Sequence, residues 1–457
     1  MILSRTHLDG QDSELESTED LDVTIPAEAA LNVATPDAPL VPTGSASGGA
    51  PSRLVWTVTD QVLSSGTNFA LGILIARSVS AKSFAIFTLT FAAYQIFCGI
   101  SRAVISEPLV VRFTRDDLLK EKRSIKSATG ASLSIGGAVG LGIVLVSFAL
   151  TGEDRTAFLV LGFGMPALLL QDCWRFVFFA AGRPAYATVN DGIWMVTQLG
   201  LVTLLIVSGD TGIGMLLGAW CVSGFAAALF GLLQAKVVPN PRAGWRWIVS
   251  TRDLSTRFLA EFAIGNGTSQ ILLWLVGFSA GILAAGALRA AQLLLGPPRV
   301  VVQAAYSAIV PEGVRLRRRH PSVFPFAVVV CALVLAGANL IWGTIFIALP
   351  EELGKDLLGK SWASAQPLIL PLAIAAAAFG AQTAAIAALR VLAAADRSLR
   401  ARIITAPVGL AAAIGGGAVA GARGAAIGIA TGSIFAATVT WTQWLAAVHD
   451  IHKQPNT

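Results

Sequence analysis

The amino-acid sequence predicts an all-α integral membrane protein with about twelve transmembrane helices. Hydrophobic residues make up 54% of the chain, charged residues only 13%, and the mean hydropathy is +0.69. A soluble chain of this length would need more charge to cover its surface. Apolar stretches recur from Val55 to His449, and each can cross a hydrocarbon core of about 30 Å as a helix. The stretches are unbroken rather than alternating, which favours helices over the strands of a barrel.

The first 52 residues differ in composition from the rest. One basic residue, Arg5, stands against nine acidic residues, and Pro, Ser, Thr and Gly fill much of the remainder. Such a segment buries too little apolar surface to order itself, so we predict a disordered, acidic cytoplasmic tail over 1–52. It lacks the basic and then apolar segments of a secretory signal peptide. Without this tail of net charge −8, the chain's net charge would rise from +6 to +14, which suits anionic lipid or an anionic substrate.

The apolar stretches divide the remaining chain into twelve predicted helices. An N-terminal six-helix lobe is expected over 53–236, a cytoplasmic linker over 237–257, a C-terminal six-helix lobe over 258–448 and a cytoplasmic tail over 449–457. The predicted transmembrane helices cover residues 55–77, 84–111, 127–150, 156–181, 187–208, 211–236, 258–278, 282–312, 322–349, 364–390, 400–420 and 424–448.

The loops between these helices alternate in basic residues. One set carries twenty Lys and Arg, including the cluster "RLRRRH", whereas the opposite set carries six. Because cytoplasmic loops are enriched in Lys and Arg, both termini and the central linker are predicted to be cytoplasmic. We therefore expect a multi-pass protein of the cell (inner or plasma) membrane.

A weak internal repeat relates the two predicted lobes. The phrase "DQVLSSGTNF" opens the first helix and "EFAIGNGTSQ" opens the seventh, so that Asp60 aligns with Glu261. Glu107, near the end of the second helix, aligns in the same way with Glu312 in the eighth. Six helices separate each pair, so the lobes share one orientation. The pattern predicts two six-helix bundles related by a parallel internal repeat.

At this point the sequence resembles a known superfamily. The segment "SSGTNFALGILIARSVSAKSFAIFTL" resembles the polysaccharide-exporter, or lipid-linked oligosaccharide flippase, branch of the multidrug/oligosaccharidyl-lipid/polysaccharide (MOP) flippases. Members of that branch typically have a polar first helix that ends in "AR". Ala85 or Ile86 replaces a glycine of that pattern. The matching residues are Gln61, Ser64–Ser65, Asn68, Ala76-Arg77 and Phe84–Leu89.

The resemblance implies an alternating-access flippase rather than an enzyme. Its substrate would be a lipid-linked oligosaccharide or polysaccharide precursor, moved from the inner to the outer leaflet through a cavity between two lobes. Membrane lipids, a coupling ion (H⁺ or Na⁺) and polysaccharide-assembly proteins are the implied partners, and nucleic acid is not among them.

Ionisable residues inside the apolar stretches are the candidate site residues. Each costs about 2.5–3.5 kcal/mol at a helix centre, so a function or a partner is expected. Arg102 lies ten residues before Arg112, about 15 Å into the membrane. Arg289 and Arg299 lie in the eighth predicted helix, the latter after two prolines. Because a guanidinium matches phosphate oxygens, these arginines are predicted to receive a lipid pyrophosphate. The alternative for Arg102 is an ion pair with a neighbouring helix.

Other polar residues complete the candidate site. The spacing of Asp172 and Arg175 predicts an intrahelical pair, and Arg175 could otherwise contact substrate. Asn68 is a polar cavity candidate, and Trp174 could stack on a sugar. The acids predicted to couple an ion or gate the cytoplasmic side are Asp60, Glu107, Asp172, Glu261 and Glu312.

Three alternatives remain open at the sequence level. A multidrug cation antiporter of the same fold would favour acidic over basic cavity residues. A membrane protein of polysaccharide biosynthesis without transport activity is also compatible. A membrane enzyme is disfavoured because no long external loop carries paired catalytic groups. The four cysteines and four histidines are scattered without metal or triad spacing, so we expect no metal and no cofactor.

Overall fold

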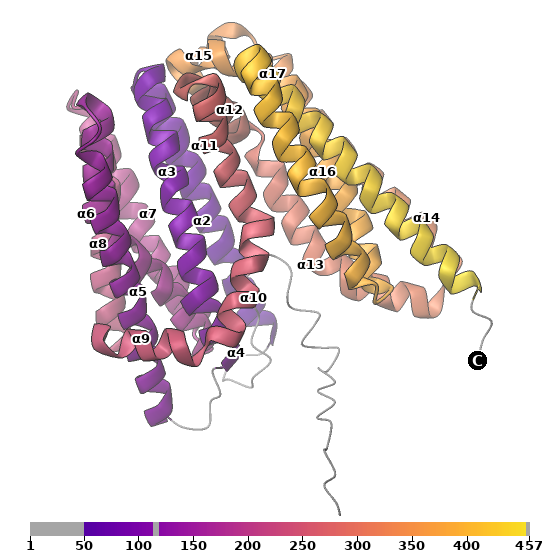
Figure 1. The fold of residues 1–457 in the computed structure, drawn as a ribbon, viewed down its shortest axis with the longest axis horizontal. Helices are drawn as coiled ribbons and strands as arrows, with labels where there is room; N and C mark the ends of the chain where they lie inside the picture. The colour runs from indigo at the N-terminus through magenta and orange to yellow at the C-terminus, as the bar shows by residue number, and fades with distance from the viewer. Residues whose placement is uncertain (1–49, 113–117, 454–457) are drawn as a thin grey trace, which may run out of the picture. The chain divides into compact units, whose positions relative to one another are not determined.

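The computed structural model describes residues 50–112 and 118–453, and its regular elements there are all helical (Figure 1). Most of the predicted acidic tail lies outside these residues, but residues 50–52 already belong to the first described helix. The predicted tail at 449–457 is helical up to Lys453. The longer helices are α2 (Ala50–Ser78), α3 (Ala81–Ser101), α5 (Leu118–Ser147), α6 (Gly152–Ala180), α7 (Pro184–Val207), α8 (Ile213–Ala235), α13 (Gly296–Arg319), α14 (Phe324–Ile347), α16 (Trp362–Val391) and α17 (Ala395–Lys453).

Shorter helices interrupt or connect these long ones. Within the described residues, eight helical segments are long and apolar enough to cross a membrane, and α11 and α12 are shorter apolar helices. The chain is thus a multi-pass membrane protein, while the number twelve and the two-bundle repeat stay predictions. The short elements are η1 (Arg102–Ser106), α4 (Glu107–Arg112), α9 (Pro241–Ser250), α10 (Arg252–Phe262), η2 (Ala263–Gly267), α11 (Thr268–Ala280), α12 (Ile282–Leu294), α15 (Glu351–Leu358) and η3 (Gly359–Ser361).

Helices α2 to α8 pack through a core centred on α3 and α6. In this group α6 contacts α3, α5, α7 and α8, and α2 packs against α7 (Figure 1). An aromatic ladder runs along α3, where Phe91 and Tyr94 both meet the fully buried Trp220 of α8, with ring centroids 5.7 and 4.9 Å apart. Helix α3 also packs against α11 and α12 of the C-terminal part, so it is buried from both sides.

The C-terminal helices pack around α16, which contacts α13, α14 and α17. Helix α17 is interrupted at Ala420 and Gly421, where the backbone leaves the helical region and Gly421 adopts φ +56°. The chain folds back at this point, and the two halves of α17 approach each other through glycines. A Cβ atom on Gly424 would lie 1.9 Å from the backbone oxygen of Gly416. Only glycine permits this approach, because any side chain would force the halves apart.

We expect Gly424→Ala to lower the stability of the protein by about 1–3 kcal/mol, the usual cost of overpacking. Thermal unfolding of the purified protein in detergent micelles would measure the change. Gly415→Ala is the matched control, since a Cβ there meets nothing within 4 Å and the intrinsic helix propensity gains equally. Equal unfolding temperatures for the two variants would contradict the close contact.

The second predicted transmembrane helix continues to Arg112 but passes through a π-helical turn at Arg102–Ser106. Pro108 has no N–H to donate, and the preceding turn η1 is π-helical, with Glu107 N–H donating to the carbonyl of Arg102. The carbonyl of Val104, four residues before the proline, instead accepts a hydrogen bond of 2.9 Å from the Ser255 hydroxyl of α10. The turn η1, which precedes Pro108, therefore packs against the linker helix α10. It begins at Arg102, which the sequence predicts to lie deep in the membrane.

The eighth predicted helix is two helices. Helix α12 ends at Leu294 and α13 begins at Gly296, with prolines in its first turn. Because proline fits a first turn but not a helix interior, Pro297-Pro298 starts a new helix rather than kinking an old one. Arg289 and Arg299 consequently lie on different helices, on either side of this break.

The predicted linker at 237–257 is mostly helical and is tied to the membrane part. Helix α9 crosses α5, where Gly130 and Gly244 allow close backbone contact. At the start of α10, Asp253 accepts hydrogen bonds of 2.6 and 2.8 Å from Nη2 of Arg112. Desolvation raises the pKa of Asp253, but the Arg112 guanidinium and backbone N–H groups outweigh it, so the pKa lies below its ordinary value.

Candidate functional site

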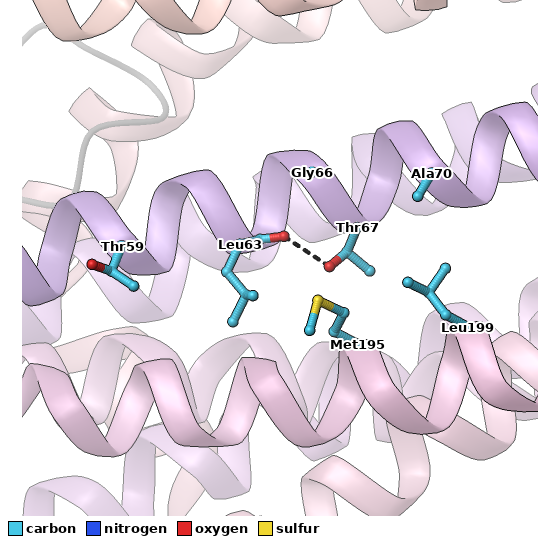
Figure 2. Close-up of a pocket in the computed structure, with 7 residues that line it drawn as sticks. All are labelled: Thr59, Leu63, Gly66, Thr67, Ala70, Met195 and Leu199. Atoms are coloured by element: carbon cyan, nitrogen blue, oxygen red, sulfur yellow. Dashed lines mark hydrogen bonds between the residues drawn. The ribbon is translucent and has the colours of Figure 1, made fainter.

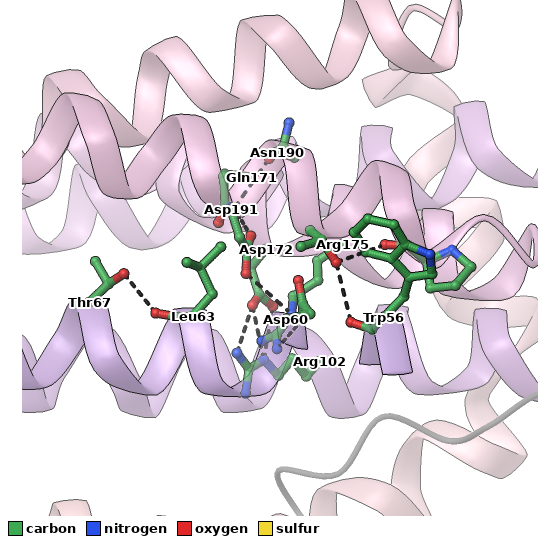
Figure 3. Close-up of polar contacts among 12 residues, drawn as sticks. Trp56, Asp60, Leu63, Thr67, Arg102, Gln171, Asp172, Arg175, Asn190 and Asp191 are labelled. Carbon is green, nitrogen blue, oxygen red and sulfur yellow. Dashed lines mark hydrogen bonds and ion pairs between the residues drawn. The ribbon is translucent and has the colours of Figure 1, made fainter. Parts of the chain in front are cut away.

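Five charged side chains gather between α2, η1, α6 and α7 (Figure 3). We call them the N-terminal charged cluster: Asp60, Arg102, Asp172, Arg175 and Asp191. Four of them, Asp60, Arg102, Asp172 and Arg175, were predicted as site residues from the sequence, where they are spread from residue 60 to residue 175. The helix packing described above brings them together.

Arg102 and Asp172 form a bidentate ion pair across η1 and α6. Nε of Arg102 donates to the two carboxylate oxygens at 3.1 and 2.9 Å, and Nη2 donates to Oδ1 at 2.7 Å. The guanidinium also lies 5.6 Å from the ring centroid of Phe176. This is the interhelical pair that the sequence left as the alternative for Arg102. The Arg102 side chain keeps 23% exposure, so it can still meet an anion.

Arg175 is more deeply engaged. Its Nε donates to Oδ2 of Asp60 at 2.7 Å, and Nη2 lies 2.5 Å from the same oxygen. Asp191 of α7 approaches from the other side, with Oδ2 3.5 Å from Nε. All three residues are buried. Arg175, predicted as a possible substrate contact, thus joins α2, α6 and α7 through their acids.

A layer of amides holds this cluster in place. Gln171 donates to Oδ1 of Asp191 at 2.9 Å and to Asn190 at 3.3 Å. Asn190 donates in turn to the Ala227 carbonyl at 2.9 Å and to Gln234 at 3.1 Å, both on α8. Each amide is buried and satisfied, as a low-dielectric network requires. Together with the ion pair of Asp60, these hydrogen bonds fix the positions of α2, α6, α7 and α8 relative to one another.

The charges of the cluster do not cancel. Three carboxylates face two guanidiniums, which leaves one negative charge in excess among the described residues. Asp60 is fully buried, and its Oδ1 has no hydrogen-bond partner there. A buried, unsatisfied carboxylate oxygen is costly. The Oδ1 atom of Asp60 is therefore the one carboxylate oxygen of this cluster, among the described residues, that is buried without a hydrogen bond.

Arg289 and Arg299 have a different environment. Within the described residues, neither forms an ion pair with a carboxylate. Arg289 lies 5.4 Å from the ring centroid of Phe91 in α3, and Arg299 lies 5.6 Å from that of Phe379 in α16. The charge of Arg299 acts on Arg289, so the two positive charges contribute to the same region of positive potential. Both guanidiniums therefore lie on aromatic faces without a carboxylate partner among the described residues.

The other predicted site residues lie apart from these two groups. Trp174 is fully buried, and its ring packs where a Cβ on Gly231 of α8 would come within 2.4 Å. Its faces are covered, so it is a packing residue here and not a sugar platform. Asn68 is exposed on α2. Glu312 is exposed and pairs with Arg315 at 2.6 Å, one helical turn away.

Glu107 and Glu261 lie beside the two π-helical turns, Glu107 after η1 and Glu261 before η2. Glu107 is half-buried at the start of α4, whereas Glu261 is exposed near the end of α10. Arg402 and Arg390, at the ends of α17 and α16, act electrostatically on Glu261. The gating role expected of Glu261 stays a prediction.

Sequence reasoning missed two participants. Asp191 was not singled out, although an acid inside the apolar stretch of α7 is the same signal that identified Asp172. Ser255 was not singled out either, and no sequence signal marks it. Its hydroxyl donates to the Val104 carbonyl, which lies 151 residues earlier in the chain.

No family model and no curated protein matches the chain. Solved structures do match in fold. An inward-facing multidrug resistance MATE family transporter of the MOP superfamily aligns over 88% of this chain and 100% of its own, with TM-score 0.66 and 14% identity. The lipid II flippase MurJ, in an inward closed conformation, aligns over 88% of this chain and 94% of its own, with TM-score 0.61 and 9% identity.

A third match is a MOP superfamily transporter from Pyrococcus furiosus Vc1, described by a reverse polarity of its binding pocket that suggests a different function. It aligns over 88% of this chain and 96% of its own, with TM-score 0.51 and 14% identity. The chain therefore has the fold of the MOP-superfamily transporters. The resemblance seen in the sequence is confirmed at the level of that fold, while the polysaccharide-exporter branch stays a prediction.

Proposed function

We propose that the protein is a membrane transporter that moves a lipid-linked oligosaccharide or polysaccharide precursor from the inner to the outer leaflet by alternating access. The fold and the apolar helices support a transporter. The choice of substrate rests on one observation, the pair Arg289 and Arg299, which has no carboxylate partner among the described residues. A pyrophosphate is the anion that a lipid-linked saccharide carries through the membrane, and guanidinium forks match its oxygens.

The N-terminal charged cluster has a different part in this proposal. Its two arginines are already neutralised by acids, so it is less suited to receive an anion than Arg289 and Arg299. Its excess negative charge and the unpartnered Oδ1 of Asp60 suit a coupling H⁺ or Na⁺. Arg102 lies between the two roles, because it is paired with Asp172 and still partly exposed.

A strain lacking the gene tests the function directly. Its lipids would be extracted, and polyprenyl-pyrophosphate-linked saccharide would be quantified beside surface polysaccharide. We expect the lipid-linked saccharide to accumulate and the surface polymer to fall, with both restored by the wild-type gene. Unchanged levels of both, in a strain with no second flippase of this fold, would contradict the proposal.

The second candidate is a multidrug or cation antiporter of the same fold. The excess negative charge of the N-terminal charged cluster favours it, and one of the matched structures is a multidrug resistance transporter. In the same deletion strain this function would appear as increased drug susceptibility with normal lipid-linked saccharide. Arg289 and Arg299 argue against it: they have no carboxylate partner among the described residues, and their like charge would repel a cationic drug.

A further inference from the structure

One side of the linker helix α9 is buried against the helix bundle, and the opposite side is exposed. Ala243, Gly244 and Trp247 are buried. Gly244 meets the backbone of α5, where a Cβ would lie 2.7 Å from the Cα atom of Ala131. We call the exposed side the α9 face. Its residues are Arg242, Trp245, Arg246 and Val249.

The α9 face has one apolar row and one cationic row. Trp245 and Val249 are four residues apart, and so are Arg242 and Arg246, so each pair lies along one line of the helix surface. Trp245 is 71% exposed, although it is the largest apolar side chain of the row. Within the described residues, neither arginine forms an ion pair. Exposed tryptophan beside arginine is typical of a helix that lies in a membrane surface.

The contacts of α9 place this face at the level of the lipid headgroups. Just before the helix, the Asn240 N–H donates to the carbonyl of Lys126 in α5 at 2.9 Å. The sequence predicts that this helix enters the membrane at residue 127, directly after that contact. Helix α9 also lies across the direction of the long helices and not along it (Figure 1). A helix in the plane of the membrane surface has this arrangement.

The linker around α9 carries an excess of positive charge. Residues 237–257 contain four arginines and one acid, Asp253. Asp253 is already engaged by Arg112, at 2.6 and 2.8 Å, so it does not neutralise the α9 face. The enrichment of cytoplasmic loops in basic residues explains the sign of this charge. It does not explain why a tryptophan is exposed between Arg242 and Arg246, whereas contact with lipid does.

The apolar hollow between α2 and α7 provides the contrast (Figure 2). Its volume is about 530 Å³, and none of the described residues that line it is charged. The hydroxyl of Thr67 donates to the Leu63 carbonyl at 2.7 Å and is satisfied within its own helix. The hollow therefore has no group that distinguishes one lipid headgroup from another, and it is the internal reference for the experiment below.

We propose that the α9 face binds anionic phospholipid of the leaflet on the predicted cytoplasmic side. The headgroup phosphates would contact Arg242 and Arg246, because guanidinium groups match phosphate oxygens. The Trp245 ring would lie at the boundary between headgroups and acyl chains. Phosphatidylcholine also has a phosphate, but its choline cancels the charge, so the excess positive charge of the linker favours an anionic lipid. This surface is separate from Arg289 and Arg299, and the inference does not rest on the proposed function.

Photolabelling of the full-length protein tests the preference. The protein would be placed in nanodiscs of equal parts phosphatidylcholine and phosphatidylglycerol. A trace of one or the other lipid would carry a diazirine near the glycerol end of an acyl chain, and labelled peptides would be quantified by mass spectrometry. We expect the phosphatidylglycerol probe to label α9 about fivefold more than the phosphatidylcholine probe, since each arginine near the surface adds attraction. Both probes should label α2 and α7 equally.

Two variants divide the charge from the apolar contact. Arg242→Gln with Arg246→Gln should bring the two probes within about twofold of each other at α9, because the attraction to anionic headgroups is lost. Arg318→Gln with Arg319→Gln is the matched control, since it removes the same charge from two exposed arginines at the end of α13, and it should leave the preference at α9 intact. Trp245→Ser should lower labelling of α9 by both probes alike.

Three results would overturn the proposal. Equal labelling of α9 by the two probes in the wild-type protein would exclude a preference for anionic lipid. Labelling of α2 and α7 without labelling of α9 would show that lipid does not reach the α9 face, as expected if a protein partner covers it. Labelling of α9 that requires deletion of residues 1–49 would assign the face to that acidic segment. The proposed function would stand in each case, because the lipid analysis of the deletion strain tests it separately.

Discussion

Arg289→Gln is expected to weaken binding of a polyprenyl pyrophosphate about ten- to a hundredfold and to abolish complementation of the deletion strain. The reason is the loss of charge-assisted hydrogen bonds, each worth about 1.5–3 kcal/mol, at a site with no other neutralising partner. Because no carboxylate pairs with Arg289 among the described residues, the substitution leaves none of them buried without a partner. The protein should therefore accumulate normally, and binding in nanodiscs together with membrane protein levels would measure both effects.

The control for Arg289 is an arginine with the same aromatic contact elsewhere. Arg155 lies 5.3 Å from the ring centroid of Phe148 and is exposed at the start of α6. Arg155→Gln removes a comparable cation–π contact and should leave binding unchanged. Arg289→Lys should keep part of the binding, since the charge remains without the planar fork. Full binding by Arg289→Gln would remove the observation on which the proposed substrate rests.

Arg175→Leu is expected to lower the free energy of unfolding by about 3–5 kcal/mol, the usual result of removing one partner of a buried ion pair. Asp60 and Asp191 would both lose their guanidinium inside the protein. The double variant Asp60→Leu with Arg175→Leu should recover part of the loss, because Asp191 is then the one carboxylate of the three residues that still lacks its guanidinium. Unfolding of detergent-solubilised protein would report each value.

An exposed pair provides the comparison for Arg175. Arg315 and Glu312 lie 2.6 Å apart, but both side chains are more than two-thirds exposed. Arg315→Leu should cost no more than about 1 kcal/mol, since solvent screens the pair. A loss for Arg175→Leu as small as that for Arg315→Leu would show that the N-terminal charged cluster does not hold α2, α6 and α7 together.

These two results would also separate roles that the sequence could not separate. From composition and depth alone, Arg102, Arg175, Arg289 and Arg299 look alike, as costly charges in apolar segments. The structure divides them by their partners. Arg102→Ala would leave Asp172 without its partner, so we expect lower protein levels in addition to a loss of transport.

The sequence by itself determined the class of this protein. Apolar stretches long enough to span a bilayer must form helices, because the backbone has no other partner in lipid. The effect of proline is also local, because a missing N–H acts on its own helix: a π-helical turn precedes Pro108, and Pro297 lies in the first turn of a new helix. The fold of the MOP-superfamily transporters could be expected from the polar segment in the first predicted helix, and the matched structures agree with it at the level of the fold.

Only the tertiary structure decided which charges meet. A buried charge is stable only beside a partner, and that partner is chosen by helix packing across more than a hundred residues, as for Asp60 and Arg175. The same packing covered Trp174 with α8 and left the space beside Gly66 open, two outcomes that no local pattern distinguishes. Hydrophobicity is a property of each residue, whereas a binding site is a property of the surfaces that the fold brings together.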